Sequence, residues 1–281
     1  MQFKHFIITQ FNLRLWTKDK LNVSTYTEEW LFKRFILFDK YCFPSVEKQT
    51  EKNFIWICLF DKGTPVPYLE RIKQYQQRCP QLLPCFLDEK DTKDWLGFTQ
   101  NVIKQHLKEE DEFVVTTNLD NDDAISINMV ETVRTRIEND RKAVLYSFLY
   151  GYQYFTESGV ILKMQYPHNH FLTLVEKNKP GFATIKSRGH AAMRKHYETI
   201  DLKDYPAWIE FVHKNNVNND LRITSRIKYY PVFSTISLNN FEVDITLTRK
   251  GNIVKAFTKM PSLFAQTAIR KLQKKISKPK K

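Results

Sequence analysis

The sequence predicts an α/β fold with a mostly parallel sheet flanked by helices. Over the first 140 residues, short apolar runs alternate with longer amphipathic stretches, which is typical of strands joined by crossover helices. The strand-like runs, such as "FIWICLFD" at Phe54–Asp61, are apolar almost throughout, so both faces of the sheet should be covered. After Lys142 the sequence changes to adjacent strand-like runs, and this change predicts an elaborated C-terminal half.

Each expected element of the first half follows from a local pattern. Thr25 and Glu28 form a capping-box pattern ahead of a wide apolar helical stripe, and Gly63-Thr64-Pro65 separates the second strand from the next helix. The expected strands are His5–Thr9, Phe54–Asp61, Leu83–Asp88 and Phe113–Leu119. The expected helices run from about Thr25 to Tyr41, Val66 to Arg78, Trp95 to Leu107 and Ser126 to Asn139.

The second half is expected to begin with a hairpin, formed by the runs 143–155 and 159–166 with a turn near Gly159. Another strand is expected within 168–177, a helical piece at Gly189–His196 and a last helix at Pro261–Ile276. The sequence has no internal repeat and no Gly/Ser-rich linker. We therefore expect one domain over residues 1–260, followed by a basic helix and tail at 261–281.

Acidic residues follow the strand Phe113–Leu119 directly. Asp120, Asp122 and Asp123 place three carboxylates within four positions, and these repel one another unless a cation or hydrogen-bond donors neutralise them. Ligands of such sheets bind beyond the carboxyl ends of the strands, and a hard divalent cation is commonly held by carboxylates together with substrate phosphates. The D-x-D of Asp120 and Asp122 therefore predicts a metal–diphosphate site. The alternative is a turn with a solvated helix cap, and Asp123 alone is a candidate cap for the helix that follows.

The positive charge is concentrated at the C-terminus. Of the net charge of +13, seven cations lie in the last dozen residues, which contain no acid. This tail is expected to be a solvated end or to dock on anionic lipid headgroups. The four cysteines are expected to be free thiols, and no apolar run is long enough for a signal peptide or a transmembrane helix. We therefore expect a cytoplasmic protein, with peripheral contact to the inner face of the membrane as an option.

Several segments together carry a resemblance to a known family. "TNLDNDDAIS", with "HFIITQFNLR", "YCFPSV", "NFIWICLFD" and "WIEFVHKNNVNN", resembles the rhamnosyltransferase family of glycosyltransferases with the GT-A fold, over about residues 3–235. The resemblance implies a nucleotide-sugar-binding half at 1–140, an acceptor-side half at 141–260, and a D-x-D that holds Mn²⁺ or Mg²⁺ against the donor diphosphate. It also implies a saccharide or lipid-linked saccharide acceptor and a role in bacterial surface polysaccharide synthesis.

The resemblance also implies roles for individual residues. A histidine from the C-terminal half completes the metal shell in many GT-A enzymes, and Mn²⁺ accepts imidazole. The expected metal ligands are Asp120, Asp122 and His213. The expected donor contacts are Thr9, Asn12, Arg14, Asn121 and Asp123, and the candidate phosphate contacts are Arg188 and His190. Arg14 is expected to compensate for Gln10, which stands where the family commonly has an arginine.

An incoming hydroxyl needs a general base, which in inverting enzymes is usually an acid on the acceptor side. Glu176 is the first candidate, because it closes an apolar segment in the acceptor-side half, and Glu157 is the reserve.

Two other functions compete with glycosyl transfer. A sugar-phosphate nucleotidyltransferase would require a glycine-rich loop after the first strand, and "QFNLRLWTKDK" has no glycine there. A basic nucleic-acid-binding protein would interleave cations with aromatic residues on one surface. Here the aromatic residues lie in apolar runs, and over half of the excess charge is in the tail. A nucleic-acid-binding protein also does not explain three acids at a strand end.

Overall fold

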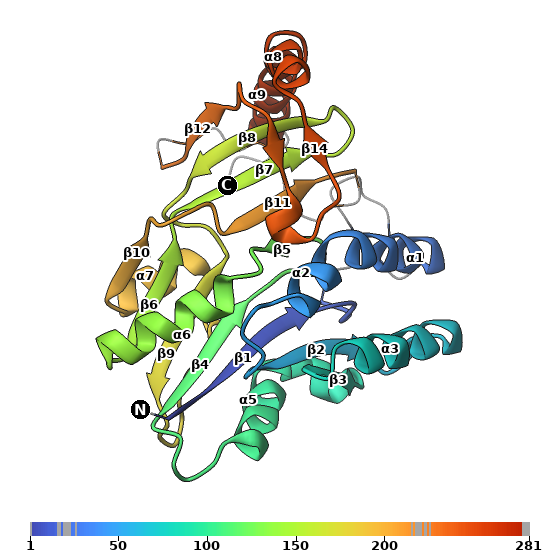
Figure 1. Ribbon diagram of the computed structural model, residues 1–281. Helices are drawn as coiled ribbons and strands as arrows, with labels where there is room; N and C mark the ends of the chain where they lie inside the picture. The colour runs from blue at the N-terminus through green and yellow to red at the C-terminus, as the bar shows by residue number, and fades with distance from the viewer. Residues whose placement is uncertain are drawn as a thin grey trace.

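The computed structural model describes residues 2–15, 18, 24, 25, 27–214, 216, 221, 224 and 226–276. Residues 277–281 of the predicted basic tail lie outside this range. Figure 1 shows two sheets stacked one above the other, with the N-terminal strands in the lower one and the C-terminal helices at the top. Among the described helices, none combines the length and the hydrophobicity needed to cross a bilayer.

The larger sheet confirms the predicted architecture. It has seven strands in the order β10-β6-β9-β4-β1-β2-β3, and every neighbouring pair is parallel except those that involve β9. The strands are β1 (Phe3–Gln10), β2 (Ile55–Asp61), β3 (Leu82–Leu87), β4 (Phe113–Asn118), β6 (Val144–Phe148), β9 (Leu172–Lys177) and β10 (Thr199–Leu202). β9 runs antiparallel to both β4 and β6.

Helices cover both faces of this sheet, as the continuous apolar strands predicted. Successive residues of β1 point to opposite faces, so Ile7 packs in one core cluster and Phe6 and Ile8 in the other. The first cluster is covered by α1 (Glu28–Leu37), the π-helical turn η1 (Phe38–Cys42), α2 (Phe43–Glu47), α3 (Val66–Arg78) and α6 (Met129–Asp140). The second is covered by α5 (Trp95–His106), which follows the short α4 (Glu89–Lys93), and by α7 (His190–His196).

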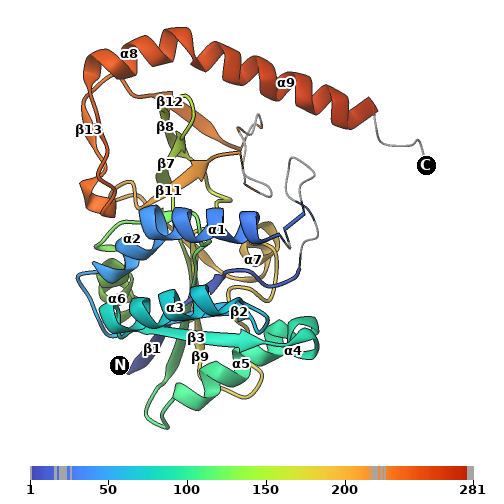
Figure 2. The same cartoon turned by 90° about the vertical axis from the view of Figure 1, so that its right-hand side faces the viewer.

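The elaborated C-terminal half contains a second sheet of five strands in the order β12-β8-β7-β11-β5. These are β5 (Ala124–Ile125), β7 (Tyr150–Phe155), β8 (Val160–Gln165), β11 (Trp208–Val212) and β12 (Lys228–Pro231). The remaining elements are the hairpin β13 (Ile236–Ser237) and β14 (Thr246–Leu247) with η2 (Asn239–Phe241) between them, then α8 (Arg249–Thr258) and α9 (Met260–Ile276). Figure 2 shows α8 and α9 along the top of the molecule, on the far side of the second sheet from β1.

Two local expectations were wrong. The run 143–155 is not one strand, because β6 belongs to the large sheet and β7 to the second sheet. The chain changes sheets at Leu149, between β6 and β7, and at Gly151 in β7 an added Cβ would lie 2.1 Å from the Trp208 ring. An apolar run contains no information about which sheet accepts it. The cap of α1 is also not Thr25: the side chain of Thr27 accepts a hydrogen bond from the backbone N–H of Trp30.

Candidate functional site

A cavity of about 370 Å³ lies beyond the carboxyl ends of β1 and β4. The strand order reverses at this pair: the chain continues from β1 to β2 and β3 on one side of β1, and later strands, beginning with β4, lie on its other side. A crevice at such a point is the usual ligand site of an open α/β sheet. The wall includes the segment after β1, the acids after β4, helix α1 and the loop before α7: Gln10, Phe11, Leu13, Leu15, Thr25, Trp30, Arg34, Trp95, Asp120, Asn121, Asp122, Ile185, Lys186, Arg188, Gly189, His190 and Asn216.

Asp122 is buried and receives three donors on one oxygen. Its Oδ2 lies 2.5 Å from Nη1 of Arg34, 2.9 Å from Nε2 of His213 and 3.0 Å from Nδ2 of Asn216. Burial disfavours the charged carboxylate, but Arg34 and His213 outweigh it and hold the pKa of Asp122 well below its usual range. The guanidinium of Arg34 also lies 5.0 Å from the centre of the Trp30 ring, a cation–π distance. Asp122 is therefore charged and neutralised by the protein's own groups.

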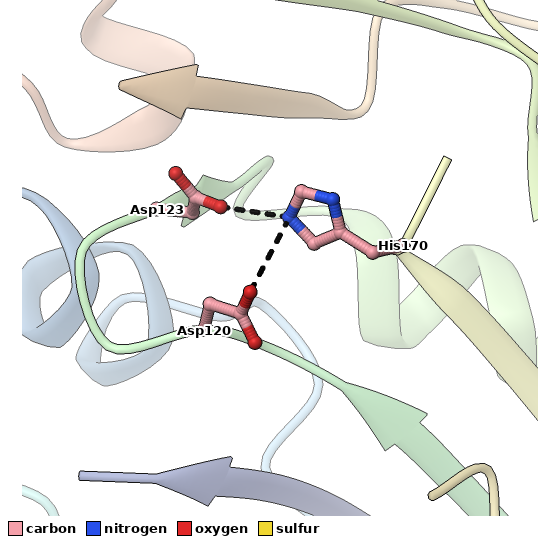
Figure 3. Close-up of side chains that lie close together, drawn as sticks. All are labelled: Asp120, Asp123 and His170. Atoms are coloured by element: carbon pink, nitrogen blue, oxygen red, sulfur yellow. Dashed lines mark hydrogen bonds and ion pairs between the residues drawn. The ribbon is translucent and has the colours of Figure 1, made fainter. Parts of the chain in front are cut away.

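The carboxylate of Asp123 is held by hydrogen bonds inside the protein. One carboxylate oxygen accepts a hydrogen bond from Nε2 of His170 at 2.8 Å (Figure 3), and the other accepts one from the backbone N–H of Phe211 at 3.0 Å. Burial raises the pKa of Asp123, whereas for His170 the carboxylates of Asp123 and Asp120 outweigh burial and raise the pKa of the imidazole. The pair therefore retains a proton to higher pH than a free imidazole would. The alternative that Asp123 caps the next helix is wrong, because α6 begins at Met129 with Asn128 as its N-cap.

Asp120 is the most accessible of the three acids. Its side chain is 44% exposed, and its carboxylate lies 3.7 Å from Nζ of Lys186 and 3.8 Å from Nε2 of His170. Burial opposes ionisation, but these two groups lower the pKa of Asp120 overall. Burial also lowers the pKa of Lys186, whose side chain is only 11% exposed. The carboxyl group of Asp120 thus faces the cavity with one cation beside it.

Two sets of side chains in this region have the chemistry to hold a metal ion. Of the predicted ligands, Asp122 and His213 are in direct contact and Asp120 lines the same cavity as Asp122, but among the described residues these three do not bring their ligand atoms within 4.8 Å of one another. A different trio, Asp120, Asp123 and His170, brings one ligand atom from each residue to within 4.8 Å of the others. Both sets offer carboxylate oxygen and imidazole nitrogen, which suit Mn²⁺.

Five of the predicted donor and phosphate contacts line one of two neighbouring cavities. Asn121, Arg188 and His190 line the large cavity, together with Asp120 and Asp122. Asn12 and Arg14 line a smaller cavity of about 180 Å³, which shares Thr25 and Trp30 with the large one.

Two of the expected donor contacts are buried within the protein. The hydroxyl of Thr9 accepts a hydrogen bond from Nε1 of Trp56 in the core, and both oxygens of Asp123 are already bonded. Thr9 and Asp123 are therefore not brought to the cavity.

The candidate bases are not brought to the cavity either. Glu176 is paired in register with Val114, near the start of β4, because β9 runs antiparallel and its end lies at the opposite edge of the sheet from Asp120. Its carboxylate accepts hydrogen bonds from the backbone N–H of Ala183 and the hydroxyl of Tyr197. Glu157 follows β7, and its carboxylate accepts one from the backbone N–H of Lys214.

Sequence reasoning missed Arg34 and Trp30 as residues of the cavity wall. Arg34 lies on the buried stripe of α1, with Trp30, Leu31 and Phe35. In the sequence, a cation at an apolar position of the expected helix was the signal that could have identified Arg34. Within the described structure, Nε of Arg34 and Nε1 of Trp30 are buried without a hydrogen-bond partner. Both atoms are donors on residues that line the cavity, so the wall suits a ligand rich in acceptors.

The fold and the cavity define an α/β protein with a candidate ligand site at the edge of the sheet where the acids follow β4. The family model described as "Putative rhamnosyl transferase" matches residues 6–225. The chain belongs to this family.

Solved structures provide more distant similarities. The crystal structure of S. aureus TarS 1-349 in complex with UDP is 13% identical with a TM-score of 0.43, over 75% of this chain and 61% of that chain. A structure described as "putative nucleotide-diphospho-sugar transferase from Desulfovibrio desulfuricans G20" is 11% identical with a TM-score of 0.36, over 74% of this chain and 82% of that chain. The chain thus spans less than two thirds of the TarS structure. Comparison with curated proteins found no significant match.

Proposed function

We propose that the protein is a metal-dependent glycosyltransferase that moves a sugar from a nucleoside-diphosphate donor to a hydroxyl of a saccharide or lipid-linked saccharide acceptor. The family description makes rhamnose the first sugar to test, and bacterial surface polysaccharide synthesis is the process in which such a transfer would serve. The observation that carries the proposal is the cavity at the ends of β1 and β4, where carboxylates and cations face the same space.

The charges of the wall support a diphosphate ligand. Arg34, Lys186 and Arg188 are cations of the wall, and only Asp120 and Asp122 are acids among its residues. The two buried donors without a partner, on Arg34 and Trp30, add hydrogen-bonding capacity for phosphate oxygens. A neutral sugar alone would not require this excess of cations. A diphosphate with an attached sugar provides both the negative charge and the acceptors.

Two acids of the wall, together with His213 beside one of them, also fit a divalent cation. Asp122 and His213 already lie 2.9 Å apart, and Asp120 presents an accessible carboxylate to the same cavity. We assign the metal to Asp120, Asp122 and His213, with substrate phosphate as the natural further ligand. Such an ion would supply Lewis-acid stabilisation of the leaving diphosphate. Because Arg34 contacts the same oxygen of Asp122, metal binding at this position requires the guanidinium to share or to leave that oxygen.

The protein's own cations have a direct role in the transfer. When the bond between the sugar and the diphosphate breaks, negative charge develops on the leaving diphosphate, and preorganised cations lower the energy of that state. Lys186 and Arg188 precede α7 and line the cavity together with the segment that follows β1. Lys186 also approaches Gln10 at 3.5 Å, so its ammonium group lies where the first strand ends. This position suits contact with a phosphate above β1.

The acceptor hydroxyl needs a base from the cavity wall, because Glu176 lies at the other edge of the sheet. The wall offers the carboxylate of Asp120 and the imidazole of His190. With Asp120 assigned to the metal, we assign the general-base role to His190, because an unprotonated imidazole nitrogen can accept the proton of an attacking hydroxyl. His190 is exposed at the start of α7, where an incoming acceptor can reach it.

The proposed function is tested by thermal unfolding in the presence of nucleoside diphosphates with uracil, thymine or guanine bases, each with and without Mn²⁺. A ligand that binds only the native state raises stability by RT ln(1 + [L]/Kd). We expect one nucleotide to raise the unfolding temperature, and the shift to require Mn²⁺. A panel with no stabilisation by any nucleotide would overturn the proposed donor class.

A further inference from the structure

The last 33 residues of the chain account for nearly all of its excess charge. From Arg249 to Lys281 there are eleven lysine and arginine residues and no acid, which leaves a net charge of only +2 for residues 1–248. Asp244 is the last acid of the sequence. The start of this basic region is α8, so the region is larger than the tail and includes two helices of defined structure. Such a separation of charge favours an anionic partner for this end of the molecule.

Helix α8 also exposes apolar side chains among these cations. Val254 is 51% exposed and Phe257 is 73% exposed, and their spacing of three places them on one face of the helix. Phe233, which is 48% exposed, lies beside Phe257 with ring centroids 6.4 Å apart. Exposed Lys250 lies one turn before Val254 on the same helix. We call Phe233, Val254 and Phe257 the α8 patch.

Helix α9 packs against the protein through its first half. Met260, Leu263 and Phe264 pack against the second sheet, in a cluster with Val160 and Leu162. Further along, Ile269 is 54% exposed. Figure 2 shows α9 continuing past the second sheet, on the side where α7 and the N-terminal end of α1 lie. These two elements contribute His190 and Trp30 to the wall of the cavity.

The combination of apolar and basic groups indicates which kind of anionic partner fits this region. A bilayer surface provides an apolar layer for Phe257 and Val254 directly beneath anionic headgroups for the flanking cations. A nucleic-acid duplex provides the phosphates but no matching apolar layer. A second copy of the chain would bring two regions with eleven cations each into contact without any acid between them.

We propose that the region from α8 to the C-terminus docks on an anionic lipid surface, with the α8 patch inserted at the level of the headgroups. This inference goes beyond the glycosyl transfer proposed above and does not depend on it.

The test is sedimentation of the full chain with vesicles. Vesicles of phosphatidylcholine alone are compared with vesicles that also contain about 30% phosphatidylglycerol, at about 0.1 M and about 0.5 M salt. We expect binding only to the anionic vesicles and weaker binding at the higher salt. The double variant Lys250→Gln/Lys259→Gln should lower the partition coefficient by about fivefold for each cation removed. The double variant Val254→Ser/Phe257→Ser should lower it by about tenfold or more.

Matched controls separate a surface effect from a general loss of charge or folding. Lys62→Gln/Lys90→Gln removes two exposed cations, and Phe32→Ser removes a half-exposed aromatic residue, both outside the α8–α9 region. Both controls should bind anionic vesicles as the unmodified protein does, and all variants should keep its unfolding temperature.

Three results would overturn the proposal. The first is that the protein sediments equally with neutral and anionic vesicles, or with neither. The second is that both α8 double variants bind vesicles as the unmodified protein does. The third is binding of random duplex DNA, or self-association lost in Val254→Ser/Phe257→Ser, without vesicle binding. Donor-dependent thermal stabilisation in solution is measured without vesicles, so its success or failure is distinguishable from either outcome here.

Discussion

Nη1 of Arg34 lies 2.5 Å from Oδ2 of Asp122, and this contact joins helix α1 to the acids that follow β4. Both side chains are more than 90% buried. A buried carboxylate with a guanidinium partner is stable without any other cation, so repulsion among the acids does not by itself require a metal. The contact also sets a condition for metal binding at Asp122: the dication must share its carboxylate with Arg34 or take the place of the guanidinium.

The first prediction concerns this pair. Replacing Arg34 with glutamine leaves the buried charge of Asp122 without its main counter-ion, so the free energy of unfolding should fall by about 3–5 kcal/mol in metal-free buffer. Mn²⁺ should then restore more stability to Arg34→Gln than it adds to the unmodified protein, because the dication replaces the lost charge. Thermal unfolding with increasing Mn²⁺ measures both effects.

Arg194→Gln is the matched control for that experiment, because Arg194 forms a partly buried ion pair with Asp201 away from the acids. It should lower stability without increasing the response to Mn²⁺. An identical Mn²⁺ response in Arg34→Gln and the unmodified protein would contradict the assignment of Asp122 to the metal.

The second prediction distinguishes the two possible metal sets. His213→Gln retains a side chain that can donate to Asp122 but removes the imidazole ligand, so Mn²⁺ affinity should fall by more than the ~10–100-fold typical of outer-shell partners. His170→Gln should keep the Mn²⁺ affinity and lose about 1–3 kcal/mol of stability, because the buried Asp123 contact is disturbed. Isothermal titration with Mn²⁺ checks the affinities. The reverse pattern would assign the metal to Asp120, Asp123 and His170.

The third prediction concerns His190. If it is the general base, His190→Gln should lower kcat by about 100-fold or more while the KM for the donor changes little. If it only contacts phosphate, the KM for the donor should rise and the pH profile should persist. Initial rates across pH, with donor and acceptor varied separately, make the distinction. A wild-type kcat with an unchanged lower pH limb in His190→Gln would exclude the base role.

The fourth prediction is a pH dependence of stability from His5, which is buried in β1 and bonded to the hydroxyl of Thr117. Burial lowers the pKa of His5 to about 3. The unfolded chain, with an ordinary histidine pKa, therefore binds a proton below about pH 6.5 that the folded protein rejects. The stability present above pH 6.5 should fall by up to about 1.4 kcal/mol per pH unit as the pH drops below it.

His5→Gln should have a shallower dependence between pH 6.5 and 4, because all other titrating groups are retained. Urea unfolding of both proteins at several pH values gives the slopes. Equal slopes would show that His5 contributes no such linkage.

Sequence reasoning succeeded where the signal was local. The bounds predicted for α3 match the structure, and strands β1 to β4 and helix α5 lie within a few residues of their predicted positions. These elements follow from apolar periodicity and turn residues within one segment. The same logic placed Asp120 and Asp122 at the carboxyl edge of the sheet, because that edge is defined by the direction of a parallel strand.

It failed where the outcome depends on distant parts of the chain. Glu176 was chosen because it ends a strand-like segment, but β9 runs antiparallel, so the end of β9 lies at the wrong edge. Arg34 meets Asp122 across 88 positions of sequence, and no local pattern contains that pairing. Asp123 was expected to contact the donor or to cap a helix, whereas its partners, His170 and Phe211, come from the segment before β9 and from β11, respectively. Contacts between segments that are distant in the sequence decide each of these cases.

The central claim is that Asp122 and His213 hold a divalent cation against the diphosphate of a nucleotide-sugar donor. Anomalous diffraction from crystals soaked with Mn²⁺ and a nucleoside diphosphate tests it most directly. The account predicts a manganese peak in coordination contact with Asp122, His213 and a phosphate oxygen, with Arg34 displaced from or sharing Oδ2. A diphosphate bound by Arg34, Lys186 and Arg188 with no manganese peak beside Asp122 would contradict it.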